Sequence, residues 1–130
     1  MRDYQRKKSK YKLPGTTYKQ TLNIIRDYDR MKDEADKILK ESPPPPDGQP
    51  KGQGHNSSDV ERKVLRRIKY IEKINIIDKA KEKIPTEYMT GVWNNIVHDI
   101  PYPCDAHKRT YSNYKYKFIY AIAKELFILD

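Results

Sequence analysis

The chain has 130 residues, and its 27 Lys and Arg against 18 Asp and Glu give a net charge of +9. This length suits one domain or a small domain with appendages, and the positive charge favours a polyanionic partner. No apolar run approaches the roughly 20 residues that a membrane span requires, and the N-terminus lacks the apolar core of a signal peptide. We therefore exclude a membrane protein and expect a cytoplasmic location.

Two segments lack any apolar periodicity. Residues 1–12 carry six Lys or Arg against one Asp, which predicts a basic flexible arm. Such an arm can follow a nucleic-acid backbone or serve only as a solubilising tail. Residues 42–57 contain four consecutive prolines followed by three glycines, which predicts a structureless linker. A proline-rich ligand for another protein is the less favoured interpretation of the second segment.

A first long helix is expected within residues 13–41. Thr17 and Gln20 form a capping-box pattern at its start, and the helix should run to about Glu41. From Thr17 through Glu41, six basic residues balance six acidic ones, so we assign this helix to the scaffold. Its apolar stripe consists of Tyr18, Leu22, Ile25, Tyr28 or Met31, Ala35, and Ile38 or Leu39.

Residues 58–130 are expected to form a helical domain. Ser58 and Glu61 form a second capping box, and the helix that they open should run to about Lys83, before Ile84 and Pro85. Its repeating positions are Val60, Val64, Ile68, Ile71, Ile74 or Asn75, and Ile77 or Asp78. Its basic residues form a solvated face or a secondary phosphate contact: Arg62, Lys63, Arg66, Arg67, Lys69 and Lys73.

A short helix and a final helix complete the chain. Thr86 is the expected cap of the short helix, with Trp93 as a core anchor. Pro101 and Pro103 then force a turn, and Asp105 is the expected cap of the final helix. The other apolar positions of the short helix are Tyr88, Met89, Val92, Ile96 and Val97, and those of the final helix are Tyr111, Tyr114, Phe118, Ile122, Leu126 and Leu129.

The opposite face of the final helix is polar and basic. Between Ala106 and Lys124 there are five Lys or Arg and no acidic residue. Such side chains donate to phosphates and base edges, as a helix in a major groove must, although a solvated face is the alternative. The face comprises Arg109, Ser112, Asn113, Tyr116, Lys117 and Tyr120.

The titratable residues do not indicate an enzyme. His55, His98 and His107 are dispersed, and Cys104 with His107 forms a C-x-x-H pair without further ligands. The single cysteine excludes an intramolecular disulfide and a multi-cysteine zinc site. We expect no catalytic residue, metal or cofactor.

The segment from Ile84 to Leu126 resembles the C-terminal part of phage transcriptional regulators of the RinA and ArpU type. The matching positions are Arg109, Thr110 and Tyr111, then Tyr116 and Lys117, then Ile122, Ala123 and Leu126. The proline-glycine segment is also similar to a stretch in short proteins of Gram-positive prophages. The resemblance implies a helix-turn-helix like that of sigma factors, with the last helix as the recognition helix. One departure is that two prolines interrupt the place of a regular supporting helix. Either the helix beginning at Thr86 takes that role, or the last helix is not inserted as the family would suggest.

We therefore predict an all-α protein with two long helices joined by a Pro/Gly-rich linker and a C-terminal helix-turn-helix-like unit. Its expected function is sequence-specific binding of double-stranded DNA as a phage or prophage regulator. The expected groove contacts are Arg109, Ser112, Asn113, Tyr116 and Lys117, with Lys108 and Lys115 on phosphates.

Other functions and partners stay open. RNA polymerase and a second copy of the chain are further candidate partners. A phage protein-interaction module that inhibits a host defence or polymerase protein is the main alternative. It would keep its partner after deletion of residues 105–130. A small terminase subunit is the third candidate, and a ring-sized oligomer would favour it.

Overall fold

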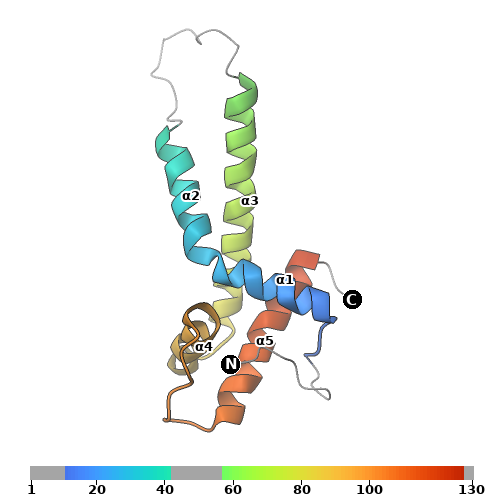
Figure 1. Ribbon diagram of the computed structural model, residues 1–130, viewed down its shortest axis with the longest axis vertical. Helices are drawn as coiled ribbons and strands as arrows, with labels where there is room; N and C mark the ends of the chain where they lie inside the picture. Colours follow the sequence, from blue (N-terminus) through green and yellow to red (C-terminus); the bar gives the residue numbers. More distant parts are fainter. Residues whose placement is uncertain (1–10, 42–56, 128–130) are drawn as a thin grey trace. The chain divides into compact units, whose positions relative to one another are not determined.

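The computed structural model describes residues 11–41 and 57–127, and all their regular secondary structure is helical (Figure 1). The prediction of an all-α fold is confirmed. Residues 1–10 of the expected arm and residues 42–56 of the expected linker lie outside the described residues. The helices are α1 (Gly15–Arg26), α2 (Tyr28–Glu41), α3 (Ser57–Glu82), α4 (Thr86–His98) and α5 (Lys108–Phe127).

The chain divides into two compact units. We call Met1–Asp27 with Asn75–Asp130 the core unit, and Tyr28–Ile74 the α2–α3 unit. The core unit therefore combines the start and the end of the chain, while the α2–α3 unit is a single insertion between them.

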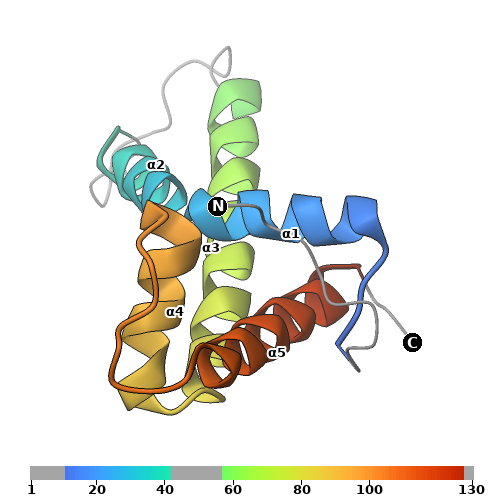
Figure 2. The same ribbon diagram turned by 60° about the horizontal axis from the view of Figure 1, so that its bottom comes forward.

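In the core unit, α1, α4 and α5 each contact the other two helices (Figures 1 and 2). Three mutually packed helices can enclose apolar side chains from every direction, and the side chains at the centre of this unit are almost fully buried. Trp93 meets Phe118 edge-on, and the Lys81 ammonium lies 3.9 Å from the centre of the Trp93 ring. The largest fully buried apolar side chains of this unit are Leu22, Ile25, Ile77, Val92, Ile96, Tyr111, Phe118, Ile119 and Ile122.

Prolines, and not the threonines expected from the sequence, begin two of the helices. Pro14 and Pro85 are the N-caps of α1 and α4, and neither helix has a side-chain cap. Their fixed φ of −54° starts each helix, and their carbonyls accept from the amides four residues later. Thr17 and Thr86 therefore lie inside helices. Likewise α3 begins at Ser57, one residue before the expected cap.

The single helix expected up to Glu41 is two helices, because the chain leaves helical geometry at Asp27. Its φ of −91° and ψ of 2° lie in the bridge region, and its amide donates to both Asn23 and Ile24 at 3.1 Å. The apolar spacing continues without a change of phase across this break, from Ile25 to Tyr28. The expected stripe is accordingly buried on both sides, at Tyr18, Leu22, Ile25, Tyr28, Met31, Ala35 and Ile38.

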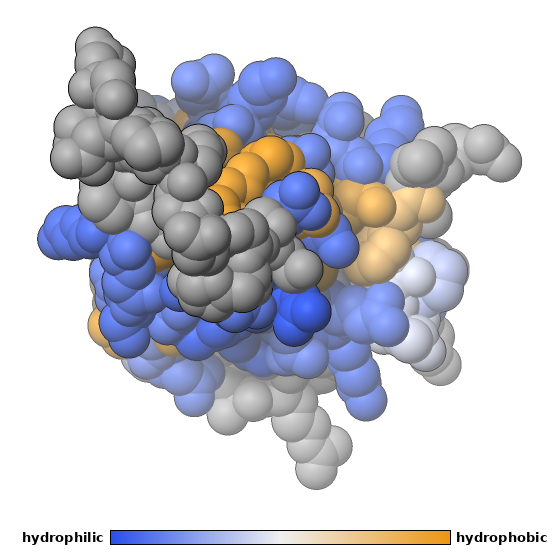
Figure 3. Space-filling model, turned by 90° about the horizontal axis from the view of Figure 1, so that it is seen from above, coloured by the Kyte–Doolittle hydropathy of each residue, from blue (hydrophilic) through white to orange (hydrophobic). Residues whose placement is uncertain are grey.

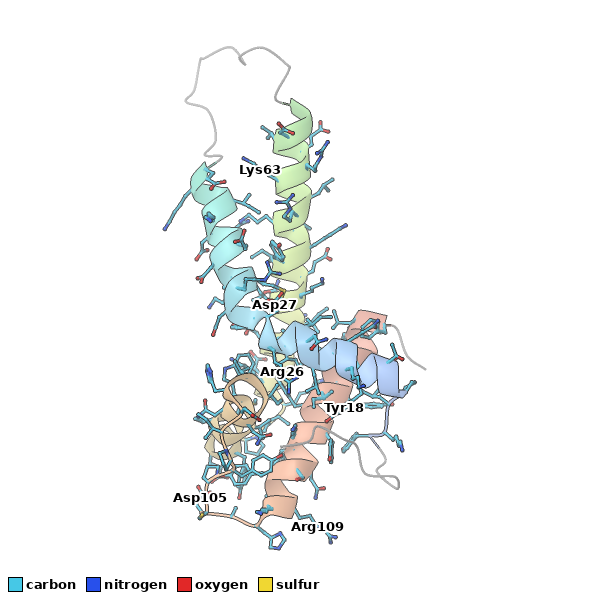
Figure 4. The ribbon with its side chains drawn as sticks, viewed as in Figure 1. Tyr18, Arg26, Asp27, Lys63, Asp105 and Arg109 are labelled. Carbon is cyan, nitrogen blue, oxygen red and sulfur yellow. The ribbon has the colours of Figure 1, made fainter. Side chains whose placement is uncertain are left out.

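In the α2–α3 unit, polar side chains of α3 reach across to α2. Arg67 Nε donates to the Ala35 carbonyl at 3.2 Å. Lys63, labelled in Figure 4, lies 3.9 Å from the Glu41 carboxylate. The Arg30 guanidinium lies 5.7 Å from the centre of the Tyr70 ring. The apolar positions expected on α3 are buried only in its second half.

No described helix is long and apolar enough to cross a membrane.

Candidate nucleic-acid interface

The start of α5 is fixed by His107, and the prediction that Asp105 caps this helix is wrong. The Arg109 amide donates to His107 Nδ1 at 3.0 Å, and the Thr110 amide donates to the His107 carbonyl at 3.0 Å. The imidazole therefore takes the place of the usual Ser, Thr, Asn or Asp cap. Asp105 precedes Lys108, the first residue of α5, by three positions and is therefore not its capping residue.

Asp105 instead accepts a hydrogen bond from the Tyr111 hydroxyl at 2.5 Å. This bond, together with burial of the ring and the nearby carboxylate charge, raises the pKa of Tyr111 to about 12. Since Asp105 precedes α5 and Tyr111 lies in its first turns, the bond ties the connecting loop to the helix that follows it.

The loop between α4 and α5, residues 99–107, is held closely despite its two prolines. Asp99 adopts a left-handed conformation with φ of 55°, and Ile100 donates to the Asn94 carbonyl at 3.2 Å. The Tyr102 ring stacks on Tyr111 with centroids 5.2 Å apart. Asn95 Nδ2 donates to the Ile100 carbonyl at 3.1 Å. The loop therefore fixes how α5 leaves α4, although it is longer than a helix-turn-helix turn.

Gly91 lets α4 approach the same loop. A Cβ atom at this position would lie 2.7 Å from Tyr111 Cε1 and 2.9 Å from Pro103 Cδ. Only a glycine fits between the tyrosine and the proline without displacing one of them.

The inner face of α5 carries the apolar residues that the sequence predicted. Tyr111, Phe118 and Ile122 are fully buried, while Tyr114 and Leu126 are half-buried. Leu129 lies outside the described residues. Because this face is packed against α1 and α4, the opposite face is held in one orientation within the core unit.

The outer face carries most of the predicted DNA contacts. Lys108, Arg109 and Asn113 are exposed, and Figure 4 shows Arg109 at the start of α5. The half-buried members of the predicted set are Ser112, Tyr116 and Lys117, with Tyr120 beside them.

Lys115, a predicted phosphate contact, lies on the inner face. Its exposed fraction is 6%, and its ammonium donates to Asn95 Oδ1 at 2.9 Å. Lys115 follows Tyr111 by four residues and precedes Phe118 by three, so it shares their side of the helix. The expectation that Lys115 is exposed is therefore corrected. Its spacing from Tyr111 and Phe118 already indicated the inner face, although its charge suggested an exposed position.

Two further residues join the outer face. Lys124 is exposed and lies seven residues after Lys117, a spacing that returns to the same side of a helix. The Tyr11 ring lies 5.6 Å from the Tyr120 ring, which brings the end of the predicted basic arm to α5. Helical spacing could have identified Lys124 from the sequence, whereas the Tyr11 contact depends on tertiary structure.

The described residues offer no group of three or more His, Cys, Asp or Glu side chains that could hold a metal ion. Cys104 is exposed, as are His98 and His107.

The chain matches no protein-family model, and neither the curated proteins nor the solved structures include a match to it.

Proposed function

We propose that the protein binds double-stranded DNA sequence-specifically and regulates phage or prophage transcription in the bacterial cytoplasm, with α5 as the helix that contacts DNA. The observation that carries the proposal is the outer face of α5. There, Lys108, Arg109, Lys117 and Lys124 extend from a helix whose other side is packed in the core.

The chemistry of this face suits a DNA groove. Arg109 can bind a guanine edge through two donors, and Asn113 can pair with an adenine edge. Lys108, Lys117 and Lys124 can neutralise phosphates, which would make the affinity depend steeply on salt. Lys115 has no part in the proposed interface because it is buried. The resemblance to sigma-factor-like regulators adds RNA polymerase as a proposed second partner.

The test compares a duplex of about 30 base pairs from upstream of the neighbouring gene cluster with an unrelated duplex, each from low to high salt. We expect a steep salt slope and tighter binding to the upstream duplex. Weak binding that is equal on both duplexes and is lost at physiological salt would overturn the proposal.

Arg109→Ala should weaken specific binding by about 1–3 kcal/mol and relax the preference for the upstream duplex. Arg66→Ala is the matched control, since it removes the same charge from an exposed position of the α2–α3 unit. An equal loss for both variants on both duplexes would assign Arg109 to non-specific attraction only.

A protein-interaction module is the second candidate, favoured by the exposed aliphatic residues of α3. Deletion of residues 105–130 cannot separate the two functions, because it would remove Tyr111, Phe118 and Ile122 from the core. Arg109, Asn113 and Lys117 changed together to alanine would instead leave the core intact. This triple variant should lose DNA but keep any partner bound by the α2–α3 unit.

A further inference from the structure

Helix α3 exposes a row of aliphatic side chains within the α2–α3 unit. Val60, Val64 and Ile68 are 45%, 46% and 46% exposed, and Leu65 is 59% exposed. Ile71 is half-buried and continues the row at helical spacing. We call these five residues the aliphatic stripe. Figure 3 shows apolar surface exposed among hydrophilic side chains.

The aliphatic stripe lies on a different side of α3 from the residues that reach α2. At about 100° per residue, Lys63, Arg67 and Tyr70 fall on one side, and these make the described contacts to α2. The stripe occupies the next side around the helix. Neighbouring exposed aliphatic residues of this kind mark a contact surface more often than isolated ones do.

The charges along the aliphatic stripe indicate what would cover it. Exposed Glu72 flanks Val64, Ile68 and Ile71 on one side, and Arg67 flanks them on the other. A two-fold axis parallel to α3 would place the acidic edge of one copy against the basic edge of another, on both sides of the contact. A polyanion fits the stripe poorly, since the stripe contains no cation and one of its edges is acidic.

The spacing agrees with a parallel pair of α3 helices. If Val64 and Ile71 take d positions and Ile68 takes an a position, Arg67 becomes g and Glu72 becomes e. A g residue and the e residue five positions later on the partner helix are the pair that meets in a parallel coiled coil. Arg67 Nε is bonded to Ala35, and a guanidinium has further N–H donors on its two terminal nitrogens.

We infer that the aliphatic stripe of α3 is a self-association surface, on which a second copy of this chain packs its own α3 in parallel. This inference does not depend on DNA binding. Because the contact extends over only about three helical turns, its area falls at the low end for specific interfaces and the dimer should dissociate on dilution.

Sedimentation of the full chain over a wide concentration range tests the inference. The wild type should pass from monomer to dimer as its concentration rises, and Ile68→Glu should stay monomeric. Ile100→Glu is the matched control, because Ile100 is also 46% exposed but lies in the loop after α4. Circular dichroism would verify that both variants keep their helices.

A wild type that stays monomeric at every concentration would overturn the inference. This outcome is expected if other residues of the same chain cover the aliphatic stripe. An equal loss of dimer in Ile68→Glu and Ile100→Glu would also overturn it. Neither outcome would bear on DNA binding, which the duplex titration measures separately.

Disulfide crosslinking tests the parallel arrangement. With Cys104→Ser as background, Ile68→Cys should form an intermolecular disulfide on mild oxidation, since a positions face their own copies across a parallel axis. Lys69→Cys should crosslink far less, because Lys69 takes a b position, outside the a and d seam and its flanking e and g positions. A dimer that forms without an Ile68→Cys crosslink would contradict the parallel pairing.

Discussion

The core unit and the α2–α3 unit use apolar residues in different ways. In the core unit, Tyr111 and Phe118 are enclosed by α1, α4 and α5, and their side chains are fully buried. In the α2–α3 unit, Val64 and Ile68 are almost half exposed, although they recur at the same helical spacing. A helix pattern therefore identifies an apolar face but does not say whether the same chain covers it.

The difference follows from the number of packed helices. Three helices in mutual contact can surround an apolar centre, whereas two helices can cover only the facing side of each other. In the three-helix arrangement, the outward face of a helix can be polar and available to a ligand. In the two-helix arrangement, an outward apolar face is stabilised only if a partner covers it.

The largest expected effect separates the two units directly. Phe118→Ala should lower the free energy of unfolding by about 3–5 kcal/mol, because it leaves a cavity in a closed core. Ile68→Ala should change it by less than about 1 kcal/mol, since alanine also favours the helix. Urea denaturation of dilute protein would measure both. Comparable losses would show that Ile68 is covered within the monomer.

A pair of glycines sharpens the contrast within the core unit. Gly91→Ala should destabilise by about 1–3 kcal/mol, because its Cβ would overlap Tyr111 and Pro103. Gly15→Ala should be neutral or stabilise by up to about 1 kcal/mol, since nothing lies within 4 Å of its Cβ. Thermal denaturation would compare them, and a stabilising Gly91→Ala would contradict the close packing.

Two lysines of α5, Lys115 and Lys117, should differ in the property that their replacement changes. Lys115→Met should cost about 1 kcal/mol of stability, since methionine fills the space while Asn95 loses a charged donor. Lys117→Met should leave stability unchanged and reduce the salt slope of DNA binding by roughly one. Denaturation and duplex titration of both variants would check this. A reversed result would place Lys115 in the interface.

Alkaline pH should affect the core unit through the Tyr111 hydroxyl. The folded state holds the Tyr111 proton up to a pKa of about 12, above the ordinary 10.0, so it binds more protons than the unfolded state in this range. Stability should therefore fall as pH rises from about 10 towards 12. The fall should be shallower in Tyr111→Phe and in Asp105→Asn, as measured by denaturation at fixed pH. Identical slopes in all three proteins would exclude this linkage.

Periodicity predicted the helices and most of their inner faces, because residue type and spacing determine where the apolar face of a helix lies. The stripe from Tyr18 to Ile38 and the core positions of α5 are examples. The break at Asp27 was not predictable from that pattern, since the apolar phase continues across it. The helix starts were also missed, because Pro14 and Pro85 begin helices through backbone geometry without a side-chain cap.

The candidate site was predicted in part for a related reason. Helical spacing places Arg109, Asn113 and Lys117 together, which needs no tertiary information. Lys115 was assigned by its charge, although its position next to Tyr111 and Phe118 indicated the inner face. Its hydrogen bond to Asn95 of α4 joins residues far apart in the sequence, and no local pattern reports it.

The contact of Gly91 with Pro103 and Tyr111 also offers a way to find relatives of this chain. The three positions are separated by 12 and 8 residues, and a Cβ atom at the first would overlap the side chains of the other two. A distant relative that keeps this packing should keep a glycine, a proline and a tyrosine at these intervals, even where its surface has diverged. The intervals would then serve as a search pattern where overall similarity fails.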